Sequence, residues 1–198
     1  MTRADGREIV PASEGRGPLY QRDYWAVIAN CRLSPSEVVD VVRERFEEFP
    51  PSEIVTFRRV GGGRAPLEVG DEMEGEIQGA GDFAVRVTHR DANSFTLATL
   101  RGHPEAGRIT FGAYRNPDGD VVFHIRSRAR SASRGRFMGF KVFGDPLQTS
   151  TWTDFIDRLA ALVGSGVADV IHAEKREVEE EPGDRVVPAP PTYVAKGD

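Results

Sequence analysis

Apolar and polar residues alternate along the middle of the chain, and this pattern predicts an antiparallel sheet. Between Ile54 and Ser131 apolar side chains recur at every second position, in runs separated by turns rich in glycine, asparagine and aspartate. In the last run, Phe123 and Ile125 fall on one face and His124 falls on the other. Repeated hairpins with one apolar face predict a meander whose opposite face, including His124, is solvated.

Two further elements precede this region. The aromatic and β-branched run from Arg22 to Cys31 predicts a first strand. Ser34 then opens a capping box, with Pro35 at the first helical position and Glu37 behind it, and so predicts a short helix. That helix ends before a pair of prolines, because proline lacks a backbone donor and clashes with the preceding turn.

The segment after Pro146 predicts a long amphipathic helix. Apolar residues recur there in steps of three and four from Trp152 to Ile171, which corresponds to roughly seven turns at about 3.6 residues each. Asp154 lies on the opposite face, one turn before Arg158, and we interpret it as a surface carboxylate in an ion pair. Only this helix is long and apolar enough to cover the sheet. We therefore predict an α+β helix-grip fold: a curved six- to seven-stranded antiparallel sheet wrapped on the long C-terminal helix, with one short helix after the first strand.

A sheet that curves around a helix leaves space wherever the facing side chains are small. Such residues occur on both sides of the predicted interface: Ala113, Ser127 and Ala129 on the sheet, and Gly164 and Gly166 on the helix. We therefore predict an internal cavity between the sheet and the C-terminal helix, which is the usual form of a small-molecule site.

Both ends of the chain are polar and lack periodicity. We expect a flexible leader at residues 1–17, a helix-grip domain at 18–173, and an acidic, proline-rich disordered tail at 174–198. No segment is typical of a secretory signal or of a bilayer span, so the expected location is cytoplasmic, without membrane insertion.

Charge and cysteine content argue against several classes of function. The net charge of −5 and the pI near 5.5 do not fit a general nucleic-acid surface, so no nucleic-acid partner is expected. One local basic series would either bind an anionic partner or, as we interpret it, form a solvated face: Arg126, Arg128, Arg130, Arg134 and Arg136. Cys31 is the only cysteine, which excludes an intrachain disulfide and a cysteine-rich zinc site.

Three segments carry a resemblance to a known family. Leu19–Trp25, Ser94–Asn116 and Thr151–Ala160 are similar to an uncharacterised bacterial and plant family, catalogued as domain of unknown function nineteen-ninety. The resemblance covers about residues 17–166 and is most specific in the motif GHPEAG, Gly102–Gly107.

That family in turn resembles the START and birch-pollen-allergen superfamily, also called SRPBCC, whose helix-grip fold matches the order of elements predicted above. Members of the superfamily bind sterols, lipids, polyketides and alkaloid precursors in an internal cavity, and a minority are cyclases, aromatases or hydrolases. The resemblance therefore implies a fold and a class of ligand, and it implies no particular reaction.

Histidines provide the candidates for chemistry. His103 lies in GHPEAG between two predicted strands, and it is the best catalytic candidate. It would act as an acid or base at a cavity mouth with Glu105 nearby, or it would only pack or cap a turn that glycine already shapes. His89 continues an apolar strand face and is interpreted as a core or rim residue. The sequence shows no metal-ligand spacing, nucleophile elbow or phosphate loop, so we expect no metal and no cofactor.

The leading hypothesis is a binding module that holds a small, largely apolar molecule. The ligand-binding candidates face the predicted cavity: His89, Phe95, Leu97, His103, Phe111, Phe123, Trp152, Phe155, Ile156 and Leu159. One alternative is an enzyme of the cyclase, dehydratase or hydrolase type that acts on a hydrophobic substrate in the same pocket. Another is a protein-interaction or chaperone-like domain that uses the outside of the sheet and the tail. The sequence does not distinguish a monomer from a homodimer.

Overall fold

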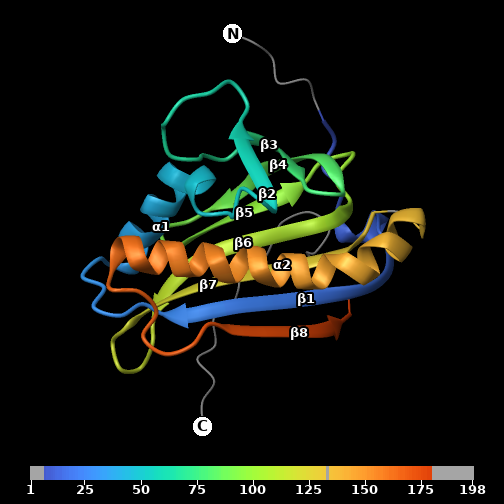
Figure 1. The fold of residues 1–198 in the computed structure, drawn as a ribbon. Helices are drawn as coiled ribbons and strands as arrows, with labels where there is room; N and C mark the ends of the chain where they lie inside the picture. The colour runs from blue at the N-terminus through green and yellow to red at the C-terminus, as the bar shows by residue number, and fades with distance from the viewer. Residues whose placement is uncertain (1–6, 133, 180–198) are drawn as a thin grey trace.

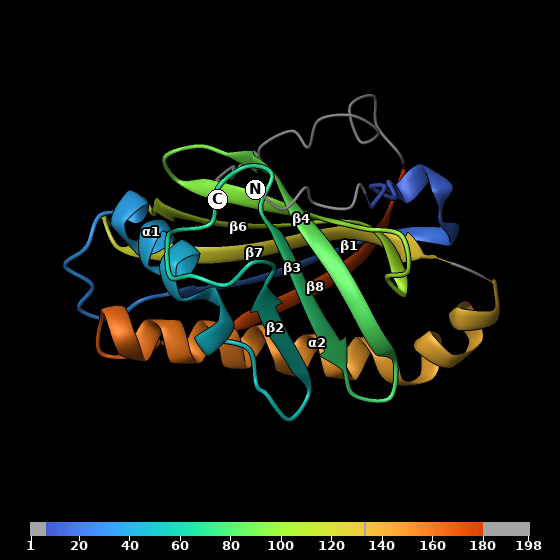
Figure 2. The ribbon, with the colours of Figure 1, turned by 90° about the horizontal axis from the view of Figure 1, so that it is seen from above.

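A computed structural model shows a curved antiparallel sheet with a long helix lying across one of its faces (Figures 1 and 2). It describes residues 7–132 and 134–179, with residues 134–144 described by their backbone alone. The sheet has eight strands in the order β2-β3-β4-β5-β6-β7-β1-β8, and every neighbouring pair is antiparallel. The predicted α+β helix-grip fold is confirmed, with one strand more than the upper end of the prediction.

The elements follow the predicted order up to the long helix. The strands are β1 (Arg16–Val27), β2 (Val55–Arg59), β3 (Glu72–Ile77), β4 (Gly81–Arg90), β5 (Ser94–Thr99), β6 (Glu105–Arg115), β7 (Val121–Ser131) and β8 (His172–Val178). The helices are α1 (Pro35–Arg45) and α2 (Arg134–Val163), with short 3-10 turns η1 (Ala12–Glu14) and η2 (Phe46–Glu48).

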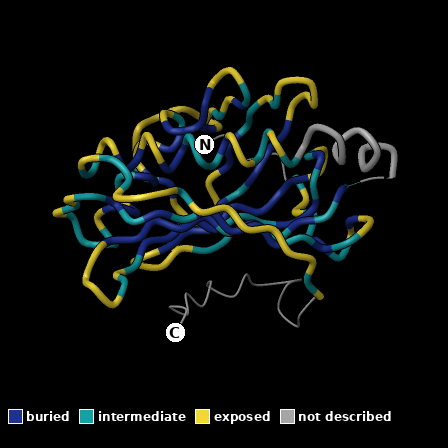
Figure 3. Tube along the Cα trace, turned by 60° about the horizontal axis from the view of Figure 1, so that its bottom comes forward, coloured by how far each residue is buried: buried dark blue, intermediate teal, exposed yellow. Residues whose placement is uncertain are grey.

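Alternation along each strand decides which side chains face the helices. On β7, Phe123 and Ile125 are fully buried, as the pattern predicts. Figure 3 shows buried positions running along the inner strands of the sheet, whereas exposed positions lie in the loops and along the edge strand β8. The prediction that His124 is solvated is wrong: it is only 7% exposed, because the ring of Trp25 lies against it with a centroid distance of 5.6 Å, and it is hydrogen-bonded to Asp23 of β1. The side chains of Arg134 and Arg136 lie outside the described residues.

Helix α2 begins and ends earlier in the chain than the helix that was predicted from the apolar residues between Trp152 and Ile171. It contains Pro146 and ends before Gly164, so the predicted helical positions 164–171 belong to the following segment. A side-chain carbon at Gly164 would lie 2.4 Å from the carbonyl oxygen of Ala29, so only glycine fits directly after the helix. Gly166 has a φ of +92°, a conformation that glycine adopts without strain. These glycines therefore serve the chain reversal after α2.

Parts of the expected leader and tail belong to the sheet. Residues 7–17 include η1 and the start of β1, and Ile9 forms a bridge with Leu100. Strand β8 pairs with residues 19–25 of β1, although its own residues are mostly charged and exposed. Because β8 has no apolar alternation, the sequence pattern gave no sign of it. Residues 1–6 and 180–198, the remainder of the predicted leader and tail, lie outside the described residues.

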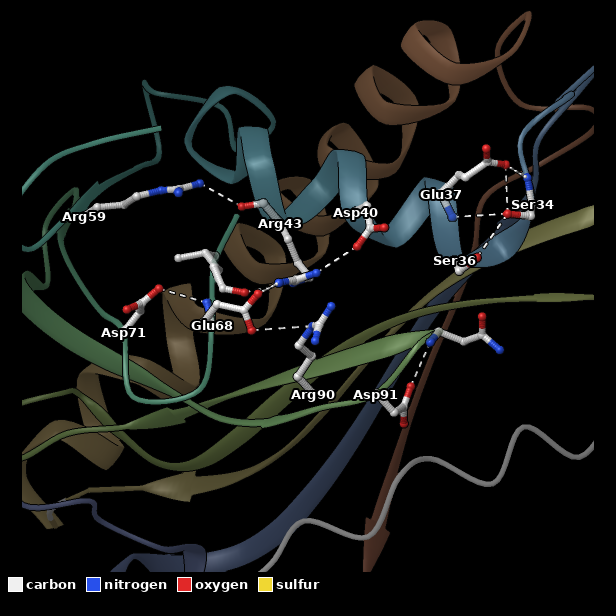
Figure 4. A network of polar contacts seen from close by, with 12 residues as sticks. Ser34, Ser36, Glu37, Asp40, Arg43, Arg59, Glu68, Asp71, Arg90 and Asp91 are labelled. Carbon is white, nitrogen blue, oxygen red and sulfur yellow. Dashed lines mark hydrogen bonds and ion pairs between the residues drawn. The ribbon is translucent and has the colours of Figure 1, made fainter. Parts of the chain in front are cut away.

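Polar contacts hold α1 over one end of the sheet, as Figure 4 shows. The hydroxyl of Ser34 accepts a hydrogen bond from the N–H of Glu37 at 3.3 Å, and the Glu37 carboxylate accepts one from the N–H of Ser34 at 2.7 Å. At the other end of the helix, Arg43 donates through Nε to the carbonyl of Leu67 at 2.8 Å and through Nη1 to Asp40 at 2.7 Å. The bond from Arg43 to Leu67 anchors α1 to the segment before β3, whereas the other three stabilise the helix itself.

Candidate ligand-binding cavity

A cavity of about 610 Å³ lies between the sheet and α2. Strands β2 to β7 and residues 147–152 of α2 form its wall. Most of the lining is apolar and includes Phe57, Phe83, Val85, Leu97, Ile109 and Trp152. The volume is within the range of roughly 300–1,000 Å³ that is usual for small-molecule sites.

Two turns form the edge of the cavity. Gly79 and Ala80, in the turn between β3 and β4, line it and are exposed. His103 and Pro104 line it from the turn between β5 and β6. Four apolar residues of the lining are only partly buried, although they pack against the core: Phe57, Ile77, Ile109 and Trp152. These four side chains border the cavity, and the described side chains do not fill it.

The other half of the interior is filled by aromatic rings. The ring of Phe46, in η2, has its centroid 5.1 Å from that of Phe111 and 5.4 Å from that of Phe155. Phe95 stacks on Phe111 with a centroid distance of 5.1 Å. All four side chains are fully buried. Because η2 places Phe46 in this half, the cavity is confined to the end of the sheet away from α1.

This division decides where the predicted ligand-binding residues lie. The cavity is lined by Leu97, His103 and Trp152. The packed core instead contains Phe95, Phe111, Phe123, Phe155, Ile156 and Leu159. His89 lies outside the cavity lining near the end of β4, where its Nε2 is 3.3 Å from Oδ2 of Asp91. Alternation identified the correct face of the sheet, and the position along each strand decided which residues border the hollow.

Glu105, at the start of β6, is the acidic group of the cavity. Its Oε1 lies 3.7 Å from Nη1 of Arg22, and Nη2 of Arg22 donates a hydrogen bond to Asp145 at 2.7 Å. Burial raises the pKa of Glu105, and this effect exceeds the opposing influence of Arg22 and of a hydrogen bond with Gln148. The carboxyl group therefore keeps its proton to a higher pH than a solvated glutamate does.

His103 combines a role in the turn with a position at the cavity. Its Nδ1 accepts a hydrogen bond from the backbone N–H of Glu105 at 2.9 Å, and its ring lies edge-on to Phe83 with a centroid distance of 5.3 Å. These contacts orient the imidazole at the edge of the cavity and shape the turn at the same time. The geometry thus accommodates both interpretations drawn from the sequence.

Several lining residues were not among the predicted ligand-binding set. They include Val85, Glu105, Ile109, Ser127, Gln148 and Thr151. Val85 and Ile109 could have been predicted from the sequence, because they fall on the same strand faces as neighbouring residues of the predicted ligand-binding set. Gln148 and Thr151 carried none, since they precede the apolar stripe from which the long helix was predicted. Ser127 and Ala129 were identified as small residues that leave space, and both line the cavity; Ala113 lies in the packed half instead.

Residues 15–173 match the sequence profile of a family described as a domain of unknown function, DUF1990. The chain belongs to this family. The resemblance expected from GHPEAG and the two flanking segments is thereby confirmed. No curated protein matches the DUF1990 chain.

Solved structures share the fold of this DUF1990 domain. It is similar to a hypothetical protein from Helicobacter pylori, with a TM-score of 0.52 and 11% identity over 82% of this chain and 99% of that one. It is also similar to major latex-like protein 151 from Panax ginseng, with a TM-score of 0.51 and 11% identity over 74% and 99% of the two chains. At these identities the likeness is one of fold alone.

Two negative findings apply to the part of the DUF1990 domain that the structure describes. None of its helices combines the length and the apolar character that crossing a membrane requires. Within the same residues, histidine, cysteine and acidic side chains do not gather in groups of three that could hold a metal ion.

Proposed function

We propose that this chain is a small-molecule-binding domain that holds a largely apolar ligand in the cavity between the sheet and α2. The observation that carries the proposal is the hollow of about 610 Å³ with its mostly apolar lining. Moving a largely apolar molecule from water into such a space is favourable by roughly 25 cal/mol per Å² of apolar surface buried. The single cysteine is in keeping with action in the cytoplasm.

The test fills the cavity and measures the affinity for an apolar fluorescent probe, phenylnaphthylamine. Ala129 is 4% exposed and lines the cavity, so Ala129→Leu places additional carbon atoms inside it. Ala173, exposed on β8, provides the matched control Ala173→Leu. We expect Ala129→Leu to weaken probe binding about tenfold, equivalent to about 1.4 kcal/mol, and Ala173→Leu to leave it unchanged. Equal binding by both folded variants and the parent, or no binding by the parent, would contradict the proposal.

A second candidate function is acid–base catalysis on the bound molecule. The observation that favours it is the Glu105 carboxyl group, which lines the cavity next to His103 and whose pKa is raised by burial. Small molecules extracted from the purified parent and from Glu105→Gln and identified by mass spectrometry distinguish the two functions. A binding protein carries the same compound in both forms, whereas an enzyme accumulates a different compound, its substrate, in the variant.

The interaction-domain alternative depends on the outside of the sheet and on the tail. Residues 180–198 of that tail lie outside the described residues, so the structure adds no support to it.

A further inference from the structure

Ser127 presents a buried hydroxyl group to the cavity. It lies on β7, lines the cavity and is 5% exposed. Its Oγ has no hydrogen-bond partner among the residues that the structure describes. A buried polar atom without a partner costs stability, and native structures contain few of them. Within a mostly apolar lining, this hydroxyl keeps its hydrogen-bonding capacity for a bound molecule.

The other buried hydroxyl groups of the lining are already satisfied. The Oγ1 of Thr151 donates to the carbonyl of Leu147 at 2.8 Å, one turn earlier in α2. The Oγ1 of Thr99 donates to the carbonyl of Val10 at 3.0 Å and accepts from the N–H of Gly107 at 3.0 Å. All three residues line the cavity, but only the hydroxyl group of Ser127 lacks a hydrogen-bond partner among the described residues.

The surroundings of Ser127 specify which polar group fits. In the sheet register Ser127 lies opposite Arg22 of β1, and Arg22 already faces two carboxyl groups, those of Glu105 and Asp145. Asp145 already balances the charge of Arg22 through a hydrogen bond of 2.7 Å, so an anionic ligand would lose its hydration in this poorly solvated site without gaining Arg22 as a free counter-charge. An uncharged oxygen has no such penalty, and the Ser127 hydroxyl can either donate to it or accept from it.

We propose that Ser127 anchors the polar end of the ligand, which is an uncharged, largely apolar molecule with a hydroxyl or carbonyl oxygen at one end. This inference rests on the proposed function, because it assigns the polar contact of the same cavity. The hydrocarbon part of the molecule then lies against the apolar lining, among Val85, Leu97 and Ile109.

The test compares two fluorescent probes of nearly the same shape, hydroxypyrene and methylpyrene, on the purified full-length protein. The ratio of their affinities isolates the contribution of the hydroxyl group from that of the hydrocarbon. Ser127→Ala removes the anchor. Thr151→Val is the matched control, because it removes a hydroxyl that also lines the cavity but is bonded to its own helix. Circular dichroism and thermal unfolding establish that each variant is folded.

We expect Ser127→Ala to shift the affinity ratio about fivefold towards methylpyrene, the size of one lost hydrogen bond, with the affinity for methylpyrene itself within about twofold. Thr151→Val leaves the ratio unchanged. Two results overturn the inference while the proposed function stands: a ratio that Ser127→Ala does not change, as when only water bonds to Ser127, or tighter binding of pyrenecarboxylate than of hydroxypyrene. If the parent protein binds neither pyrene probe, the proposed function fails together with the inference.

Discussion

The carboxylate of Asp23 on β1 lies 2.7 Å from Nε2 of His124 on β7, although 101 residues separate the two in the sequence. The same carboxylate accepts hydrogen bonds from Nε of Arg126 at 2.5 Å and from Nε2 of Gln21 at 2.8 Å. Burial by itself would raise the pKa of Asp23, but the hydrogen bonds from these three partners outweigh it and hold the pKa at about 2. This cluster lies on the opposite face of the sheet from the cavity and ties β1 to β7.

Asp23→Asn is expected to make stability less dependent on acid pH. Because the pKa of Asp23 is depressed from 3.8 to about 2 in the folded state, its ionised form stabilises the fold at neutral pH. That stabilisation is lost as the pH falls from about 4 towards 2. We expect the variant to lose about 2 kcal/mol of unfolding free energy at neutral pH and much less near pH 2, measured by urea unfolding.

Asp157→Asn is the control for this experiment, since Asp157 is an exposed aspartate on α2. We expect its unfolding free energy at neutral pH to be close to that of the parent protein, because substitutions at exposed positions change stability little. A loss in Asp23→Asn that is the same at neutral pH and near pH 2 would show that ionisation of Asp23 contributes nothing.

Glu105→Gln is expected to have the opposite dependence on pH. The raised pKa of Glu105 in the parent protein means that its carboxyl group holds the proton more tightly in the folded state than in the unfolded chain. The parent therefore loses stability as the pH rises from the ordinary glutamate value of 4.5 through the raised pKa, whereas the variant, which cannot ionise, does not. Thermal unfolding at a series of pH values measures the difference. Parallel curves for the two proteins would mean that Glu105 titrates alike in the folded and unfolded states.

The two glycines of GHPEAG are expected to differ in their tolerance of a side chain. A Cβ at Gly107, where φ is +153°, would lie 2.2 Å from the carbonyl oxygen of Arg128 on the paired strand. A Cβ at Gly102, where φ is +104°, meets nothing within 4 Å. We expect Gly102→Ala to cost about 1–2 kcal/mol through backbone strain alone, and Gly107→Ala to cost more than about 4 kcal/mol or to prevent folding. Chemical denaturation of both variants checks this, and equal costs would contradict the close approach of β6 and β7.

Local sequence patterns predicted much of the fold because the interactions behind them are local. The Ser34–Glu37 capping box is formed as predicted, since its bonds join residues three positions apart. The alternation on β5 and β7 placed Leu97 and Phe123 on the inner face, because successive side chains of a strand point to opposite sides. The same reasoning failed for β8, whose charged residues form a strand only because β1 offers an unpaired edge.

The candidate site was less accessible to this reasoning. Periodicity indicated which face Phe111 and Ile109 share, but it could not show that Phe111 is packed against Phe46 while Ile109 borders the hollow. Periodicity also could not predict that Glu105 lies 3.7 Å from Arg22, or that the Ser127 hydroxyl has no hydrogen-bond partner among the described residues.

The sequence by itself determined the antiparallel meander, the short capped helix, the existence of a long helix across the sheet, and the family. Each of these follows from the spacing of residues close together in the chain or from a local motif. Only the tertiary structure decided where the cavity lies, which residues line it, and that Asp23 meets His124. The physical reason is that packing and charge pairing depend on the distance in space between segments, and the path of the chain sets those distances only once the sheet has curved around α2.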